Sequence, residues 1–405
     1  MKVRVFIFAM VIAVSGFAQK RTSSGNKTVA TTFRFIGSSE TNGSSNAVIV
    51  DEVPLAHTMQ FLPLDRRGNL LHPGDLNKQV DQVFLNISKA LKPAGSDIDK
   101  IVKLNVFLKD VNLLSLVQQM IGKKFTPGKY PAITFAAGNL AHPEALISID
   151  AIAVSKFSSV GKVQLTGSEN SKRHANVAIL PKGPVVYVSG QAAKGGLAEA
   201  TRSTLKQLDE TLKSLGIEKK HIVQVKSFLS PMSSLSIVER EFSEFFKGES
   251  IPPLVFADWI SSDPVIEIEL IASSPAEIVK GDQVDYITPP GMTSSPVYSK
   301  VVRLNYGKKI YLSGLYGRGA VNTDSEVKSL FFAMEKVLNA SGSDFMNLLK
   351  ATYYVSNDQY SKSLGDLRAK FYNPKRPPAA SKAMLKEIGT NGEGISIDMI
   401  GTIIE

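Results

Sequence analysis

The 405-residue sequence contains no cysteine, and this absence excludes several kinds of chemistry at once. Without a thiol the chain cannot form a disulfide, bind a metal through a thiolate, use a cysteine nucleophile or carry a lipid on an N-terminal cysteine. The absence also fits an oxidising compartment, where an unpaired thiol is a liability.

Histidine is scarce too, and the histidines show no spacing typical of a metal site. The sequence has no nucleophile elbow, P-loop or dinucleotide-binding fingerprint. A glycine-rich run at 314–319 follows a predicted strand without a phosphate-binding motif, so we interpret it as a hairpin turn. We therefore expect no metal and no cofactor. The histidines are His57, His72, His142, His174 and His221.

Dense runs of lysine and arginine that alternate with aromatic residues are also missing. The formal net charge of +10 is instead spread along the chain. We interpret it as a solvated basic surface and expect no nucleic-acid partner.

The first residues form a short hydrophobic run behind positive charge. Lys2 and Arg4 precede an apolar stretch at 6–14, which is too short for a stable membrane-spanning helix. Small residues follow, which predicts a signal peptide at 1–18 with cleavage after Ala18. No later stretch is long enough to cross a bilayer, so we expect a secreted or periplasmic protein without membrane insertion. A buried first strand is the alternative interpretation.

A repeated pattern accounts for the rest of the chain. Between 183 and 272, helical spacing of apolar residues twice gives way to strand-like alternation, with Gly and Pro at the boundaries. The motif at 94–110 recurs at 341–355, each time after a helical pattern and before a proline and a closing strand. These copies predict three units, whereas the alternative is three unrelated α/β stretches.

Polar stretches separate the units. The leader is rich in Ser, Thr, Gly and Asn, with an edge strand at Phe33–Ile36 as an alternative for part of it. The predicted segments are a flexible leader at 19–46, a first unit at 47–156, a linker at 157–168, a second unit at 169–274, a linker at 275–295 and a third unit at 296–405.

Several motifs in these units resemble the RidA/YjgF family of enamine/imine deaminases. The hairpins at Ser189-Gly190 and Ser313-Gly314 resemble the family's first-hairpin signature, and Tyr298 lies in a segment similar to its opening. The second helix of the second unit and the closing strands of the first two units are similar as well. The resemblance covers almost all of the chain that follows the leader.

This resemblance implies an α+β fold class of the chorismate-mutase-like kind. Each unit is expected to be a mixed sheet covered on one face by two helices. Family members form homotrimers with a ligand cleft at each subunit interface. Because a sheet covered on one face needs cover on the other, we expect three linked copies to form an intramolecular pseudo-trimer. Such a monomer has three non-identical clefts, which are the expected small-molecule sites.

The resemblance also locates a substrate-anchoring arginine, which this chain lacks. Deaminating members hold a substrate carboxylate with an Arg where the three units carry Ile133, Leu254 and Ala380. Together with Phe107, these residues favour an uncharged or apolar ligand. Three nearby cations are alternatives for the anchor, namely Lys129, Arg376 and Lys382.

Glu267 matches the family's proposed water-handling glutamate, whereas the other units carry Ser148 and Ser396. Glu267 is therefore the candidate general acid or base, although a solvent-facing strand residue is the alternative. Glu239 stands at a helix position that is Asn in many members. Residues at the hairpins and the opening are expected to line the clefts, with turn and core roles as alternatives: Ser189, Gly190, Ser313, Gly314 and Tyr298.

Two functions remain open on these grounds. The first is an exported RidA-like protein that has lost the Arg-dependent reaction and binds a small molecule or serves as a scaffold. The second is an enamine/imine deaminase with an altered, uncharged substrate preference that uses Glu267. A ribonuclease, as described for some family members, is less favoured because the sequence shows no basic groove.

Overall fold

The computed structural model describes residues 32–157, 161–167, 174–275, 281–318, 321–389 and 392–404, together with Met1. Apart from Met1, the predicted signal peptide and the cleavage site after Ala18 lie outside these residues. The part of the chain from Thr32 onwards forms one compact unit, which contains three sheets.

The first sheet is mixed and has the strand order β5-β4-β6-β3-β8-β7. Strands β4 and β5 run parallel, and the other neighbours are antiparallel. Helices α1 (Leu76–Leu91) and α2 (Leu114–Gly122) share a hydrophobic core with this sheet. Its strands are β3 (Leu55–Thr58), β4 (Ile101–Leu108), β5 (Ala132–Ala137), β6 (Ile147–Val154), β7 (Gln164–Thr166) and β8 (Val177–Leu180).

The second sheet repeats this order with β11-β10-β12-β9-β14-β13. Helices α3 (Leu197–Ser214) and α4 (Leu235–Phe245) contribute to its core. Its strands are β9 (Val185–Gln191), β10 (Ile222–Leu229), β11 (Leu254–Asp258), β12 (Ile266–Ser273), β13 (Val284–Ile287) and β14 (Val301–Leu304).

The third sheet has the order β1-β2-β15-β19-β17-β18, and β16 also pairs with β19. Helices α5 (Thr323–Ala340) and α6 (Asp358–Phe371) pack on it. Its strands are β1 (Phe33–Ile36), β2 (Ala47–Val50), β15 (Lys309–Leu312), β16 (Leu315–Tyr316), β17 (Leu348–Val355), β18 (Ala379–Met384) and β19 (Ile395–Thr402). Short 3-10 helices occupy Ile98–Lys100, Val111–Leu113, Lys219–His221 and Met232–Ser234.

The helices follow from apolar periodicity and from capping. In α5, Val327, Leu330 and Met334 lie on one face at helical spacing and are fully buried. Asn322 caps this helix, since its side chain accepts a hydrogen bond from the backbone N–H of Ser325. The α+β class, with a mixed sheet and two helices repeated three times, is confirmed.

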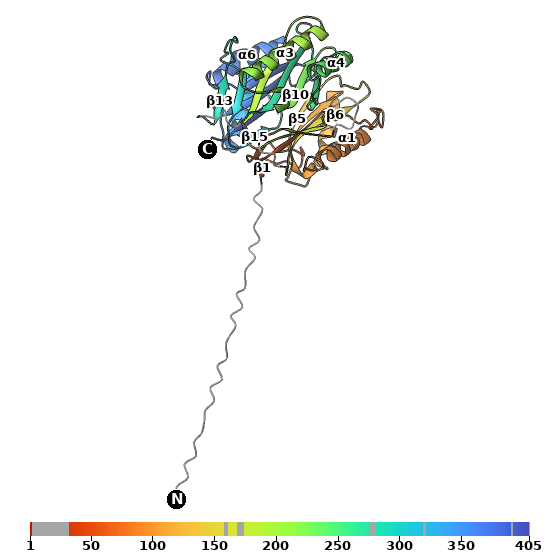
Figure 1. Ribbon diagram of the computed structural model, residues 1–405, viewed down its shortest axis with the longest axis vertical. Helices are drawn as coiled ribbons and strands as arrows, with labels where there is room; N and C mark the ends of the chain where they lie inside the picture. The colour runs from red at the N-terminus through yellow and green to blue at the C-terminus, as the bar shows by residue number, and fades with distance from the viewer. Residues whose placement is uncertain are drawn as a thin grey trace. The chain divides into compact units, whose positions relative to one another are not determined.

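Each sheet includes two strands that come from outside its own unit: the first and second sheets take them from the segment that leads into the next unit, and the third sheet takes them from the segment that leads into the first unit. Strands β7 and β8 extend the first sheet, β13 and β14 the second, and β1 and β2 the third. Short hairpin links then carry the chain into the next sheet, so the three sheets are joined in a ring (Figure 1). Consequently β1, from the predicted leader, pairs with β2, which pairs with β15, and β15 in turn pairs with the last strand, β19.

Three of these added strands, β1, β7 and β13, lie where the sequence analysis expected a leader and linkers. Phe33–Ile36 forms β1, as the alternative interpretation held, so the stretch from Phe33 on belongs to the third sheet. Gln164–Thr166 and Val284–Ile287 form β7 and β13 within the two predicted linkers. Strands of three or four residues carry too little alternation to be recognised from sequence.

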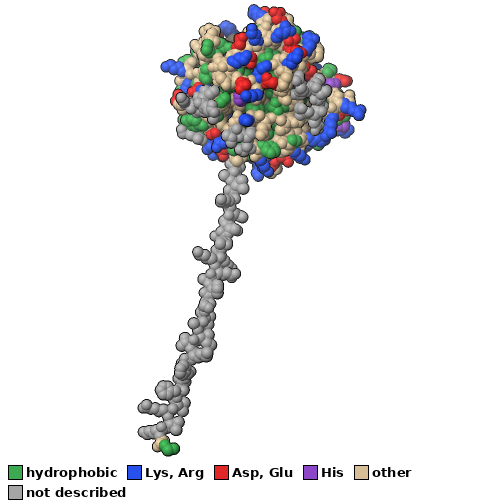
Figure 2. All heavy atoms as spheres, viewed as in Figure 1, with side chains coloured by type: hydrophobic (Ala, Val, Ile, Leu, Met, Phe, Trp, Pro, Cys, Tyr) green, Lys and Arg blue, Asp and Glu red, His purple; other side chains and the backbone are tan. Residues whose placement is uncertain are grey.

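The face of each sheet that the helices leave uncovered packs against the other sheets. Val102, Val223 and Leu349 occupy corresponding positions on β4, β10 and β17, and all three are fully buried in one shared cluster. Cover for the second face is thus supplied within the chain. On the face seen in Figure 2, lysine and arginine side chains are interspersed with acidic ones.

Candidate functional site

The sheets meet at three junctions built from corresponding positions. At each junction, the residue at the end of a first-hairpin strand donates its backbone N–H to the edge strand of the neighbouring sheet. We name the junctions after this residue: the Gln60, Gly190 and Gly314 junctions. The donated bonds run from Gln60 to the Leu254 carbonyl (3.1 Å), from Gly190 to Ser381 Oγ (3.0 Å) and from Gly314 to the Ile133 carbonyl (2.9 Å).

The Gly190 junction holds a carboxylate against the backbone. Glu267 lies on β12, next to the end of β9, and is partly exposed. A Cβ atom at Gly190 would lie 2.0 Å from Glu267 Oε1, so any larger residue would force the carboxylate out of its position. From the third sheet, the backbone N–H of Lys382 donates to the same oxygen at 3.3 Å.

The pKa of Glu267 is raised to about 7. Burial is the main cause, and the negative charge of Glu269 adds to it, while hydrogen bonds from Lys382 and Ser381 oppose the shift. A carboxyl group with this pKa is present in both protonation states near neutral pH. It can therefore accept and return a proton during a reaction.

A hydrogen-bond chain connects the Gly190 junction to buried charges. Ser381 Oγ accepts from Gly190 N and donates to Glu269 Oε2 at 2.5 Å. Glu269 Oε1 in turn lies 2.7 Å from Lys350 Nζ. Each group in this chain has a partner, which fixes its orientation beside Glu267.

The hydroxyls of Ser189 and Ser313 are engaged in equivalent bonds between sheets. Ser189 Oγ donates to the Ser299 carbonyl at 2.5 Å and accepts from Ala380 N at 2.7 Å. Ser313 Oγ donates to the Ser45 carbonyl at 2.6 Å and accepts from the backbone N–H of Ile133, which corresponds to Ala380, at 2.8 Å. Both serines thus hold an edge strand of the neighbouring unit in place.

A pocket of about 390 Å³ reaches Ser189 and Gly190 from the side of Tyr298. Lys300 Nζ donates to Tyr298 Oη at 2.5 Å and lies 4.5 Å from the centre of its ring. The pocket thus offers an ammonium group and a phenol beside the backbone of Gly190, against which the side chain of Glu267 packs.

The three junctions differ in the residues at matching positions. The position of Glu267, opposite Phe228 in the sheet register, is Ser148 in the first unit and Ser396 in the third. The position of Lys382, two residues along the edge strand from Ala380, is Phe256 at the Gln60 junction and Phe135 at the Gly314 junction. Among these positions, only the Gly190 junction combines a carboxylate with a cation.

At the Gln60 junction a side chain occupies the space that glycine leaves elsewhere. Gln60 Nε2 donates to Ser148 Oγ at 2.9 Å, and Gln60 Oε1 accepts from Phe256 N at 3.1 Å. The polar groups at the base of this junction are therefore satisfied by the protein itself.

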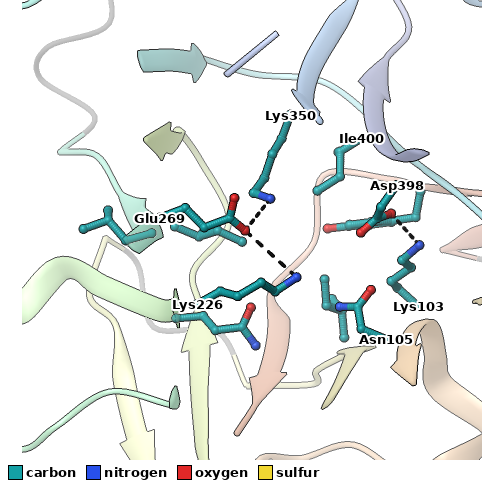
Figure 3. A pocket seen from close by; sticks show the side chains of 12 residues that line it. Lys103, Asn105, Lys226, Glu269, Lys350, Asp398 and Ile400 are labelled. Atoms are coloured by element: carbon teal, nitrogen blue, oxygen red, sulfur yellow. Dashed lines mark hydrogen bonds and ion pairs between the residues drawn. The ribbon is translucent and has the colours of Figure 1, made fainter. Parts of the chain in front are cut away.

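Where the sheets converge, three lysines are buried with Glu269 and Asp398 (Figure 3), and Asp150 is a third buried acid that interacts with Lys226 and Lys103. Lys350 and Lys226 approach Glu269 Oε1 at 2.7 and 3.9 Å, and Lys103 Nζ lies 2.7 Å from Asp398 Oδ1. The charges balance, as burial requires. A cavity of about 30 Å³ lies among them, with room for about one water molecule.

In this central cluster, burial and ion pairing shift the pKa of a given group in opposite directions. Burial lowers the pKa of Lys103, although Asp398 opposes the shift. Burial alone would raise the pKa of Asp398, but the charges of Lys103 and Lys226 outweigh it and hold the pKa below its usual range. Asp150, which accepts a hydrogen bond from Asn105 Nδ2 at 2.8 Å, has a raised pKa because it is buried.

A family model described as Endoribonuclease L-PSP matches residues 47–155 and 170–274, slightly more than half of the chain. The chain belongs to this family. This agrees with the RidA/YjgF resemblance of the sequence motifs. The third unit, beyond the two matched ranges, shows the same order of helices and strands.

Individual members of the family correspond in length to about one unit. Protein DfrA of Myxococcus xanthus is 31% identical over 111 residues, which cover 27% of this chain and 84% of that protein. RutC family protein UK114 of Drosophila melanogaster is 30% identical over 110 residues, or 27% of this chain and 78% of that protein. The structure of the Rid family protein YyfB from Yersinia pestis is 27% identical, with a TM-score of 0.28, and covers 31% of this chain and 99% of that one.

Other residues expected at the family's clefts have varied surroundings. Leu254 and Glu239 line a pocket of about 1000 Å³ at the Gln60 junction. Phe107 is 4% exposed and packs in a core shared with Phe228 and Tyr354. Ile133 is equally buried, beneath the Gly314 junction. The structure thus divides the predicted set among separate places.

Sequence reasoning missed Gln60, the large pocket and the central cluster. A signal for the cluster was present, because strands of otherwise apolar residues carry polar ones at corresponding positions. The buried polar residues are Lys103 and Asn105 on β4, Gln224 and Lys226 on β10, and Lys350 and Thr352 on β17. The acids that face them, Asp150, Glu269 and Asp398, all stand fourth in a closing strand.

Among the described residues, no group of three or more His, Asp or Glu side chains is placed to hold a metal ion. In the same part of the chain, no helix has the length and hydrophobicity needed to cross a membrane.

Proposed function

We propose that this chain is an imine hydrolase in which the Gly190 junction carries out the reaction. The observation that carries the proposal is Glu267, whose carboxylate packs on Gly190 and has a pKa raised to about 7 mainly by burial. The corresponding serines at the other junctions cannot accept a proton near neutral pH.

The proposed reaction converts an imine and water into a carbonyl compound and ammonia. Glu267 as carboxylate removes a proton from water while the oxygen attacks the C=N carbon, and the resulting carboxylic acid returns the proton to nitrogen. Glu267, again a carboxylate, then removes the hydroxyl proton of the carbinolamine and passes it to nitrogen, so that ammonia leaves as the C–N bond breaks and the carbonyl forms. Lys382, whose backbone contacts Glu267 and whose Nζ donates to Ser361 Oγ at 2.5 Å, supplies a positive charge two residues after Ala380, which stands at the position of the family's arginine.

A second function, small-molecule binding or scaffolding, is favoured for the other two junctions. Gln60 fills one of them, and Phe256 and Phe135 stand where the Gly190 junction has Lys382. We further propose that the chain acts as a monomeric pseudo-trimer and is exported after cleavage behind Ala18. Endoribonuclease, the activity in the family's description, is a third candidate, to be tested with single-stranded RNA as substrate.

The test is ammonia release by the mature chain from 2-iminopropionate and from an uncharged aliphatic imine. We expect turnover of the anionic imine, with kcat/KM rising towards a plateau above pH 7, because Glu267 must lose its proton to act as base. The uncharged imine is expected to react more slowly because it cannot use Lys382. Absence of turnover with both imines would contradict the proposal and favour the binding role.

A further inference from the structure

The small cavity inside the central cluster is lined by charged side chains from all three sheets (Figure 3). Its volume is about 30 Å³, and it shares no lining residue with the pockets described at the Gly190 and Gln60 junctions. The charged residues that line it, all of them buried, are Lys103, Lys226, Lys350, Glu269 and Asp398. The lining therefore carries three positive charges and two negative ones.

The three lysines differ in how well their ammonium groups are satisfied. Lys103 Nζ donates three hydrogen bonds at 2.6 to 2.7 Å, one of them to Asp398. Lys350 Nζ lies 2.7 Å from Glu269 Oε1 and donates to a threonine hydroxyl at 3.0 Å. Lys226 Nζ, in contrast, lies 3.9 Å from Glu269 Oε1, which is too far for a hydrogen bond. Because a buried ammonium group needs acceptors, Lys226 is the side chain that a ligand in the cavity would satisfy.

The third acid of the cluster, Asp150, does not line the cavity, and its surroundings favour the neutral carboxyl group. Asn105 lies opposite Asp150 in the sheet register, and its Nδ2 donates to Asp150 Oδ2 at 2.8 Å. The other oxygens of both side chains, Asp150 Oδ1 and Asn105 Oδ1, are buried without a hydrogen-bond partner in the described structure. A proton on Asp150 Oδ1 supplies a donor to this pair of oxygens, whereas the ionised carboxylate supplies none.

The charges that face Asp150 act on its pKa in both directions. Burial raises the pKa and is the largest effect, and the negative charge of Asp398 adds to it. The positive charges of Lys226 and Lys103 and the hydrogen bond from Asn105 lower the pKa, but they do not outweigh burial. The three acids balance the three lysines only while Asp150 is ionised, so its protonation leaves one positive charge in excess.

We propose that the cavity binds a small monovalent anion of the size of chloride, with Lys226 as its main ligand and with Asp150 protonated. A chloride ion takes up about as much room as the water molecule that the cavity can hold, whereas a polyatomic anion such as sulfate is too large. The anion accepts hydrogen bonds from Lys226 and restores the charge balance of the buried cluster. This site does not rest on the proposed imine hydrolysis.

Crystals of the mature chain grown in sodium bromide at pH 5.5 test the site directly, because bromide scatters X-rays anomalously. We expect one anomalous peak inside the cavity, within hydrogen-bond distance of Lys226 Nζ. A water molecule at that position without an anomalous signal would overturn the proposal. Bromide bound only at the surface of the chain would overturn it equally.

Thermal unfolding tests the coupling between the anion and the proton. Chloride replaces gluconate, which is too large for the cavity, at constant ionic strength. We expect Tm to rise by about 2–4 °C between 1 and 100 mM chloride at pH 5.5. The rise should be smaller at pH 8.5, because ionisation of Asp150 removes the excess positive charge. An equal rise at both pH values would overturn the coupling to Asp150.

Two variants separate the roles of the ammonium and carboxyl groups. Lys226→Met should abolish the chloride dependence of Tm at both pH values, whereas Asp150→Asn should keep the full rise at pH 8.5, since the amide cannot ionise. The control Lys206→Met removes a lysine that is 79% exposed and should behave like wild type. A wild-type chloride response in Lys226→Met would contradict the proposed ligand.

Discussion

The Gly190 and Gln60 junctions occupy the same place in two copies of one fold, yet they differ in chemistry. At one, glycine leaves room for Glu267, and Lys382 follows on the edge strand. At the other, Gln60 fills the space and bonds to Ser148 and to the backbone of Phe256. The same backbone geometry therefore does not fix the chemistry of a junction, because two or three side chains decide which groups it presents.

The largest expected effect is on stability, and it comes from the buried charges of the central cluster where the three sheets converge. Replacing Lys103 by Met leaves Asp398 buried without its ammonium partner, which should lower the free energy of unfolding by about 3–5 kcal/mol. Urea denaturation measures this, with Lys100→Met as the control, since Lys100 is 39% exposed in its ion pair. A loss below about 1 kcal/mol would show that the cluster contributes little.

Gly190→Ala would remove the feature that distinguishes the Gly190 junction, namely the space that its glycine leaves for Glu267. The added Cβ would lie 2.0 Å from Glu267 Oε1 and must displace the carboxylate, so we expect at least about a 100-fold loss of imine hydrolysis. Gly314→Ala is the matched control, because its nearest neighbour would lie 3.3 Å away and no catalytic group is involved. Similar activities for the two variants would contradict the role given to Glu267.

Much of this comparison was accessible from sequence, but not all of it. The fold could be predicted because apolar periodicity and the order of helices and strands recur in every unit. Glu267 was identified because its motif resembles that of the family. The partners of Glu267 were not predictable, because Lys382 comes from another sheet and reaches it only through the ring of strands. Strand β7 was missed since three residues show no pattern.

The raised pKa of Glu267 makes the stability of the chain depend on pH, and the corresponding serine of the first unit, Ser148, has no such effect. The pKa of Glu267 is about 7 in the folded chain against an ordinary value of 4.5, so the folded state resists ionisation of this group. The contribution of Glu267 to the free energy of unfolding is therefore fully present below pH 4.5, and it is lost as the pH rises through about 7. Glu267→Gln should stabilise the chain at pH 8 by on the order of 2 kcal/mol and have no effect at pH 4.

Thermal unfolding at both pH values measures this difference. The outcome that would contradict the account is an equal effect of the substitution at pH 8 and pH 4. Ser148→Ala, the equivalent substitution in the first unit, should give no pH-dependent difference.

The smallest expected effect concerns the substrate's charge. Lys382→Met keeps the backbone N–H that bonds to Glu267 but removes the ammonium group. We expect KM for 2-iminopropionate to rise about 10-fold, with kcat and the uncharged imine little affected. Lys375→Met, at an exposed position before β18, is the control. Equal KM values for wild type and Lys382→Met would mean that this cation does not hold the substrate.

In the proposed mechanism, one of three equivalent junctions has the residues needed for catalysis. The most direct measurement is kcat/KM for imine hydrolysis in Glu267→Gln, Ser148→Ala and Ser396→Ala, which alter the same position in each unit. We expect a loss of about 10²- to 10⁴-fold in Glu267→Gln and wild-type activity in both serine variants. Full activity in Glu267→Gln, or a comparable loss in either serine variant, would contradict it.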